Sequence, residues 1–295
     1  MNHSPSITYR SYAKINVYLD VLARRDDDFH AIETIFQTVS LFDTLHCSLH
    51  SDTLELKVEG AELSQGEDNL VMRAARVLRE RYAITQGASM RLTKRIPIAA
   101  GLAGGSGNAA AALVALNTLW DINAPVQELQ ALGGELGSDI PYCLVGGTQA
   151  GTGRGEQLIA MESIPNTWIV LAHPPITVST PEIYNHPKLF KSGAIPGPSG
   201  MSSRLEEAIQ RCDQAPLGSI LFNAMESAAL SAYPIIDEYK KRLQASGCSG
   251  VLMSGSGPTV FGLCSSQAHA EEVNDRLTEV QTTIVHTVDC GVEAE

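Results

Sequence analysis

Hydrophobic and polar positions along the first half of the chain predict a mixture of strands and helices. The segment Tyr12–Leu22 alternates between the two kinds of position and is rich in β-branched residues, which is typical of a strand. In Asn69–Tyr82 the hydrophobic residues recur three and four positions apart, which is the spacing of a helix with one buried face. Further strand-like segments lie at Ile32–Leu41, Thr44–Leu49, Leu54–Val58 and Ser89–Leu92.

The second half of the chain has a different order of elements. A buried strand is predicted at Trp168–Ala172, and the Gly/Pro/Ser-rich stretch Lys191–Ser203 is predicted to be a loop. A helix, two strands, a helix and a strand then follow, at Ile235–Ala245, Val251–Ser254, Val260–Cys264, Ala268–Val280 and Thr283–Cys290. This order is typical of an α/β sandwich. We therefore predict two domains, residues 1–160 and residues 161–295.

Composition and charge narrow the classes of protein to consider. The chain has 295 residues, is 44% hydrophobic and carries a net charge of −12, so nucleic acid and anionic membranes are unfavourable partners. The longest apolar run, Ala109–Leu119, is shorter than a membrane span, and the N-terminal segment lacks the apolar core of a secretion signal. We expect a cytoplasmic protein whose partner is a small molecule.

Six cysteines are scattered along the chain without a C-x-x-C pair. Several of them lie in apolar strand-like runs, where a free thiol packs as a small hydrophobic residue. We therefore expect buried free thiols in a reducing compartment, rather than disulfides or a zinc site.

A glycine-rich stretch precedes an alanine-rich helix and predicts an anion-binding loop. Four glycines occur within seven residues of PIAAGLAGGSGNAAAA, at Gly101, Gly104, Gly105 and Gly107. Glycines at the start of a helix allow backbone N–H groups to surround a phosphate, although a tight turn capped by Ser106 is the simpler alternative. The sequence lacks the G-x-x-x-x-G-K-[ST] string of a Walker A loop.

The same stretch also fits the dinucleotide-binding pattern G-x-G-x-x-A, from Gly105 to Ala110. That pattern requires a second strand after the helix, ending in an acidic residue. Here the helix is followed by Trp120–Pro125, which reads as a turn. Because that second strand is missing, the sequence favours a phosphate loop of another kind over a dinucleotide site.

Three segments together resemble the motifs of the GHMP kinases, the superfamily of galactokinase, homoserine kinase and mevalonate kinase. PIAAGLAGGSGNAAAA resembles their phosphate-binding motif, YAKINVYLDV their first motif, and the glycine-rich hairpin LMSGSGPTVFGL, Leu252–Leu263, their third. Phe29-His30 and Ser179–Tyr184 resemble the subgroup that phosphorylates the 2-hydroxyl of a cytidine diphosphate-linked methylerythritol, in the non-mevalonate isoprenoid pathway. The resemblance extends from Tyr12 to Leu263.

This resemblance implies an α+β fold with two domains. The N-terminal domain would be S5-domain-2-like and the C-terminal domain a ferredoxin-like α/β sandwich, with the active site in the cleft between them. It implies ATP as cofactor, accompanied by Mg²⁺, no metal held by the protein alone, and a monomer or weak homodimer. The loop residues implied to bind ATP are Pro97, Ile98, Ala99, Ala100, Gly101, Leu102, Ala103, Gly104, Gly105, Ser106 and Gly107.

Two charged residues are candidates for catalysis. Taken alone, Lys14 within an apolar strand suits an exposed sheet edge, and Asp139 in GSDIP suits the cap of a helix. The resemblance implies instead that both residues lie beside the hydroxyl that accepts the phosphoryl group. Asp139 would accept or orient the proton of that hydroxyl, and Lys14 would pair with Asp139 and stabilise charge on the transferring group.

Polar and aromatic residues elsewhere in the chain are candidates for binding the substrate. The resemblance implies that Phe29 and Tyr184 hold a cytosine ring between them and that His30 bonds its edge, with polar contacts from Asn16 and Thr180. Homoserine and mevalonate carry no base, so these residues argue against a kinase of that type. A catalytically inactive nucleotide-binding regulator is a further alternative, which the presence of both Lys14 and Asp139 disfavours.

The sequence departs from the family pattern at positions where glycine is usual. Ala103 replaces a glycine of the loop, Ala99 and Ala100 stand where glycines are common, and Asp28 precedes Phe29-His30 in place of a glycine. A positive φ at Ala103 would strain the backbone, because alanine carries a Cβ atom.

Overall fold

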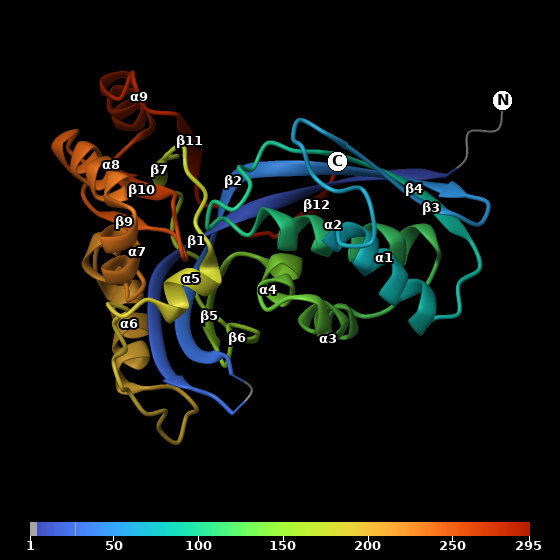
Figure 1. The fold of residues 1–295 in the computed structure, drawn as a ribbon, viewed down its shortest axis with the longest axis horizontal. Coiled ribbons are helices and arrows are strands. Elements are labelled where there is room, and N and C mark those ends of the chain that lie inside the picture. The colour runs from blue at the N-terminus through green and yellow to red at the C-terminus, as the bar shows by residue number, and fades with distance from the viewer. Residues whose placement is uncertain (1–4, 27) are drawn as a thin grey trace.

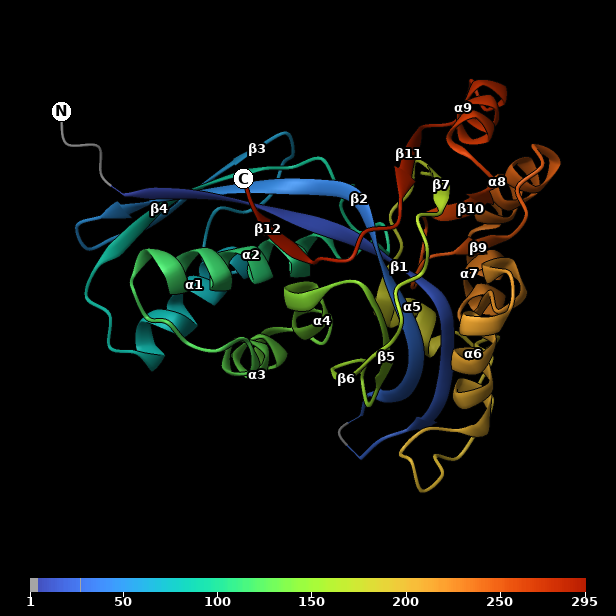
Figure 2. The same ribbon diagram turned by 180° about the vertical axis from the view of Figure 1, so that it is seen from behind.

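The computed structural model describes residues 5–26 and 28–295, which form two sheets set side by side (Figure 1). The first sheet has the order β12-β1-β2-β4-β3, with β5, β6 and β8 joined to its side, and the second has the order β11-β7-β10-β9. Helices α1 to α4 cover one face of the first sheet, and α7 to α9 lie on the side of the second sheet that faces away from the first (Figures 1 and 2).

A long antiparallel pair, β1 (Ser6–Arg24) and β2 (His30–His50), forms the centre of the first sheet. The sequence predicts two strands in place of β2, and this is wrong. Tyr12 pairs with Phe42 and the next residue, Ala13, pairs with Val39, so Ser40 and Leu41 form a bulge within one strand. The remaining strands are β3 (Leu54–Glu59), β4 (Gly87–Thr93), β5 (Thr148–Thr152) and β6 (Gln157–Ala160).

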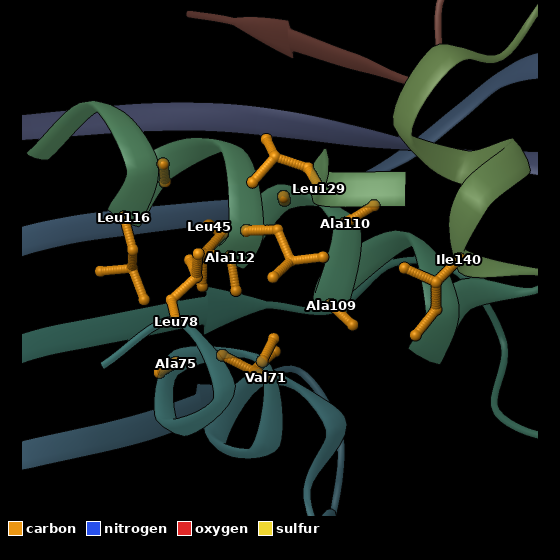
Figure 3. Packing of buried hydrophobic residues seen from close by; sticks show 14 of the residues in the cluster. Leu45, Val71, Ala75, Leu78, Ala109, Ala110, Ala112, Leu116, Leu129 and Ile140 are labelled. Atoms are coloured by element: carbon orange, nitrogen blue, oxygen red, sulfur yellow. The ribbon is translucent and has the colours of Figure 1, made fainter. Parts of the chain in front are cut away.

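The core of this half is built around helix α2 (Gly104–Leu119), whose alanine-rich segment is buried. Alanine is small, so α2 can approach both the sheet and the neighbouring helix α1 (Leu70–Arg81) closely. Figure 3 shows Ala109, Ala112 and Leu116 of α2 between Leu45 of β2 and residues of α1. Helices α3 (Val126–Leu136) and α4 (Ile140–Val145) complete this layer. The start of α2 therefore has a fixed position relative to β1 and β2.

The second sheet is entirely antiparallel and confirms the α/β sandwich predicted for this half. Its strands are β7 (Trp168–Ala172), β9 (Val251–Met253), β10 (Val260–Cys264) and β11 (Thr282–His286). Helices α8 (Pro234–Ala245) and α9 (Gln267–Arg276) pack on it. The predicted final helix and strand extend too far, since α9 ends at Arg276 and β11 at His286.

Several short elements are not apparent in the sequence pattern. Helix α6 begins where the predicted loop ends, and the hydroxyl of its cap, Ser202, accepts the N–H of Leu205. The last strand, β12, crosses back and pairs with β1, so the end of the chain belongs to the first sheet. The domain limit near residue 160 stays a prediction. These elements are α5 (Thr180–Asn185), α6 (Ser203–Gln214), η1 (Leu217–Ser219), β8 (Phe222–Asn223), α7 (Glu226–Ala232) and β12 (Val292–Ala294).

Candidate active site

A cavity of about 740 Å³ lies where the two halves of the chain meet. It is lined by the glycine-rich loop, β1, the β1–β2 turn, the start of α4, helix α5 and the hairpin between β9 and β10. Among the predicted site residues, Leu102 and Gly107 lie behind the cavity wall, buried in the core or against the backbone of Tyr12. The lining residues that the sequence predicted are Lys14, Asn16, Phe29, His30, Pro97, Ile98, Ala99, Ala100, Gly101, Ala103, Gly104, Gly105, Ser106, Asp139, Thr180 and Tyr184.

The carbonyl groups of the glycine-rich loop are turned away from the cavity by contacts on both sides. Ala100 O accepts the N–H of Thr259 at 3.4 Å, and Gly101 O accepts the hydroxyl of Ser254 at 2.9 Å. On the other side, Leu102 O accepts the N–H of Lys14 at 3.1 Å. The loop is thus held between β1 and the β9–β10 hairpin.

Every second residue of this loop adopts a left-handed conformation. The φ angles are 51° at Ala99, 76° at Gly101 and 54° at Ala103. Asp28, the other departure from a family glycine, also has a positive φ of 66°. The backbone at these residues therefore follows the path that glycine would take. The strain predicted for a positive φ at Ala103 is present.

The N-terminus of α2 presents free backbone donors to the cavity. Its N-cap residue is Ala103, whose methyl group cannot accept a hydrogen bond from them. The interpretation of Ser106 as the cap is therefore wrong. Within the described ranges no group accepts the N–H groups of Gly104, Gly105 or Ser106. Gly105 is exposed in the cavity, and a Cβ there would meet only Leu70, at 3.6 Å. The loop therefore fits the phosphates of a nucleotide.

A buried polar network beneath the loop was not found by sequence motifs. The ammonium of Lys94 donates to the carboxylate of Asp43 and, at 3.0 Å, to Asn108 Oδ1. Asp43 Oδ1 also accepts the N–H groups of Arg95 and Ile96, at 2.6 and 2.9 Å. The network joins β2, the end of β4 and α2, and so supports the loop from below. Its sign in the sequence is that two residues of opposite charge, Asp43 and Lys94, stand beside strand-like segments.

Lys14 is buried where the glycine-rich loop covers β1, so the interpretation of an exposed edge is wrong. Its Cα pairs with Thr38 of β2, and the residue is 5% exposed. The ammonium donates to Asn16 Oδ1 at 2.8 Å and lies 3.6 Å from Asp139 Oδ2. Asn16 in turn donates to Thr34 Oγ1 at 2.8 Å, which orients its amide group. A buried ammonium thus faces a carboxylate at the cavity wall.

Asp139 occupies the N-cap position of α4, but its side chain makes no capping hydrogen bond among the residues described. The carboxylate is 32% exposed and faces Lys14. The capping interpretation is therefore wrong. A carboxylate that is accessible from a cavity and held beside an ammonium can accept a proton from a bound hydroxyl.

Aromatic residues gather at the other end of the cavity. The rings of His30 and Tyr184 are stacked, with centres 5.2 Å apart and planes 11° from parallel, so the ring that faces Tyr184 is His30. Phe29 is 56% exposed and lies under the guanidinium of Arg154. The sandwich of a base between Phe29 and Tyr184 stays a prediction.

His30 has an unused hydrogen-bonding atom at this end. Its Nε2 is buried and has no partner in the part of the chain that is described. Burial, followed by the charges of Lys191 and Arg24, lowers the pKa of His30, so the ring is neutral near pH 7. Burial raises the pKa of Tyr184, whose hydroxyl stays protonated. An orphaned, neutral imidazole nitrogen can read the edge of a heterocycle.

The hairpin between β9 and β10 forms a wall of the cavity. Asn223 donates to the carbonyl groups of Met253 and Gly255, both at 2.8 Å, and Ser256 bonds the hydroxyl of Thr180 at 2.8 Å. A Cβ at Gly101 would lie 2.2 Å from Ser254 O, so only glycine allows the loop and the hairpin to come this close.

Comparison with known proteins assigns the chain to a family. Residues 69–147 match the family model of the GHMP kinases N terminal domain, and residues 205–281 match that of the GHMP kinases C terminal. A curated relative from Pelotomaculum thermopropionicum, named 4-diphosphocytidyl-2-C-methyl-D-erythritol kinase, is 42% identical and covers 95% of this chain and 97% of its own. The chain belongs to the GHMP kinases.

Other relatives of this kinase agree. A relative of the same name from Shouchella clausii is 40% identical over 90% of this chain and 88% of its own. A crystal structure of 4-(cytidine 5'-diphospho)-2C-methyl-D-erythritol kinase superposes with a TM-score of 0.78, at 32% identity, over 95% of this chain and 99% of that one. Homoserine kinase from Cytophaga hutchinsonii has a TM-score of 0.77 at 20% identity, covering 100% and 99%, which shows the shared fold.

The kinase has the two-domain GHMP fold that the sequence predicted, with the cavity between the halves. Within residues 5–26 and 28–295, no group of three or more His, Cys, Asp or Glu side chains could hold a metal ion. The Mg²⁺ that accompanies ATP therefore stays a prediction. No helix in these residues is long and apolar enough to cross a membrane. No disulfide joins the cysteines in the part of the chain that the structure describes.

Proposed function

We propose that the chain transfers the γ-phosphoryl group of ATP to the 2-hydroxyl of 4-diphosphocytidyl-2-C-methyl-D-erythritol, giving the 2-phosphate and ADP. The observation that carries this proposal is one cavity that joins three parts. These are the loop with free N–H donors, the Lys14–Asp139 pair, and the aromatic end with the orphaned His30 nitrogen. The relatives that share most of the chain are named for this activity.

The geometry suggests how the residues divide the reaction. The N–H groups at the start of α2 bind the phosphates of ATP. The oxygen of the acceptor hydroxyl forms a bond to the γ-phosphorus, its proton passes to Asp139, and the bond from phosphorus to the bridging oxygen breaks to release ADP. Lys14, held by Asn16, positions the carboxylate and offsets charge on the transferring group.

The aromatic end explains the choice of substrate. A cytosine ring has two flat faces and an edge of donors and acceptors, so it fits aromatic rings together with a directed nitrogen. Tyr184, Phe29 and His30 supply these groups, with Thr180 and Asn16 as polar contacts along the same cavity. The proposal includes ATP accompanied by Mg²⁺, a cytoplasmic location and a monomer or weak homodimer.

A turnover assay with several alcohols tests the proposal. We expect ADP release with ATP and 4-diphosphocytidyl-2-C-methyl-D-erythritol, and none with homoserine or mevalonate, because neither offers a base to the aromatic end. Phosphorylation of homoserine or mevalonate at a comparable rate would contradict the substrate assignment. Binding of both nucleotides without any turnover would identify an inactive regulator instead.

A further inference from the structure

The turn between β5 and β6 is built to hold one charged residue, Arg154. The residues on either side, Gly153 and Gly155, have φ angles of 72° and 102°, which favour glycine. The carboxylate of Glu156 accepts the N–H of Arg154 at 2.6 Å, and the N–H of Ile32 donates to Gly153 O at 2.8 Å. The turn is thus closed on itself and fastened to β2, two residues after His30.

The side chain of Arg154 extends from this turn into the cavity of the active site. Its guanidinium carbon lies 5.2 Å from the centre of the Phe29 ring, and the residue is half-buried and lines the cavity. Such a position is typical of a cation held on an aromatic face. None of the carboxylates described in this structure forms an ion pair with Arg154. Its hydrogen-bond donors therefore remain available to a ligand.

Other cations surround this end of the cavity, although the chain as a whole carries a charge of −12. Arg24 lines the same cavity, and its guanidinium lies 3.3 Å from Asp28. Lys191 and Arg24 are both close enough to His30 to disfavour its protonated form. Of the two arginines that line the cavity, Arg24 is paired with Asp28, whereas no described carboxylate pairs with Arg154. The charge of Arg154 is therefore available to an anionic part of the ligand.

We propose that Arg154 recognises the diphosphate of the substrate and so selects diphosphate-linked nucleosides over uncharged ones. This inference rests on the proposed function, in which a diphosphate joins the base at the aromatic end to the polyol beside Asp139. A guanidinium is planar and can donate two parallel hydrogen bonds to phosphate oxygens. Stacking on Phe29 holds that plane in place before the ligand binds, which lowers the cost of ordering it.

Binding of cytidine and of cytidine diphosphate tests the proposal by calorimetry. Saturating ADP is present throughout, so that the diphosphate cannot occupy the ATP site. Hydrogen bonds to charged groups are strong enough that we expect Arg154→Gln to weaken cytidine diphosphate binding about tenfold or more, with cytidine binding retained. Arg154→Lys should recover part of the loss, since a lysine keeps the charge without the planar fork.

Arg95→Gln is the matched control. The guanidinium of Arg95 also lies over an aromatic ring, 5.0 Å from the centre of Phe42, but Arg95 is exposed and outside the cavity. This variant should leave both binding constants unchanged. An Arg154→Gln variant that keeps the preference for cytidine diphosphate would overturn the proposal. Equal losses for the two ligands would also overturn it, because Arg154 would then only support Phe29.

Kinetics separate this inference from the proposed function. Because Arg154 is remote from the reacting hydroxyl in the proposed reaction, Arg154→Gln should raise KM for the substrate and leave kcat unchanged. A fall in kcat at unchanged KM would contradict a role in recognition. If the unaltered protein does not turn over the substrate, the proposed function fails, whereas the binding preference for the diphosphate still decides the role of Arg154.

Discussion

At the scale of single residues, the site depends on side chains whose ordinary structural roles are excluded by their surroundings. Lys14 pairs with Thr38 on one side and donates its N–H to Leu102 of the glycine-rich loop on the other, so it does not protect an exposed edge. Asp139 stands at the start of a helix without capping it. Burying the ammonium of Lys14 costs free energy of desolvation. A pair of this kind at the wall of a cavity is therefore typical of a functional site. This argument supports their assignment to catalysis.

Asp139→Asn tests that assignment, because asparagine caps a helix as well as aspartate but is not a base. We expect turnover to fall about 10²-fold or more while ATP binding is retained. Lys14→Met should also lower turnover, with a smaller effect on substrate binding. Steady-state rates and ATP titrations check both variants. Asp237→Asn on the surface of α8 is the control, and rates near those of the control in both variants would contradict the mechanism.

At the scale of elements, the glycine-rich loop shows how contacts can impose a backbone path on unfavourable residues. Ala99 and Ala103 adopt left-handed conformations because the carbonyl groups between them are bonded to β1 and to the β9–β10 hairpin. Each such alanine costs roughly 1–2 kcal/mol of strain. The orientation of the N–H groups toward the cavity is the functional consequence.

Ala103→Gly should therefore stabilise the protein. Relief of the left-handed strain outweighs the added freedom of glycine in the unfolded chain, so we expect the free energy of unfolding to rise by about 1 kcal/mol. Ala268→Gly, at an exposed position of α9, should instead lower it, by up to about 1 kcal/mol. Urea unfolding measures both changes. Destabilisation of the two variants to the same extent would show that Ala103 is not strained.

At the scale of the whole molecule, the two halves share the site and hold each other in place. β1 pairs with β2 and β12 and, further along, with β8, while the hairpin of the second sheet contacts the glycine-rich loop. His173 connects the parts of the second sheet. Its ring bonds Thr259 at the hairpin and Thr283 of β11, both at 3.2 Å. The position of the hairpin over the loop therefore depends on a buried imidazole.

This arrangement predicts a loss of stability in mild acid. Burial lowers the pKa of His173 to about 4, whereas a histidine in the unfolded chain titrates near 6.5. Between these values the unfolded chain binds the proton and the folded protein does not, so stability falls as the pH falls. We expect His173 to lower the free energy of unfolding by about 2 kcal/mol between pH 7.5 and pH 5.

Urea unfolding at the two pH values measures this loss. His173→Gln keeps a donor and an acceptor but does not titrate, so its stability should depend less on pH by that amount. His50→Gln, at a partly exposed position, is the control and should keep the pH dependence of the unaltered protein. The same pH dependence in His173→Gln and in the control would contradict the role of His173.

The sequence by itself determined the features that depend on residues close to one another along the chain. Periodicity predicts most strands and helices, and glycines before an alanine-rich helix predict the phosphate loop. The continuity of β2, the return of β12 to β1, the stacking of His30 on Tyr184 and the position of Arg154 over Phe29 were decided only by the tertiary structure. These contacts join segments far apart in the chain, and their free energy comes from pairing and burial that no local pattern records. For the same reason the sequence names Lys14 and Asp139 as candidates, but only the fold brings them to 3.6 Å.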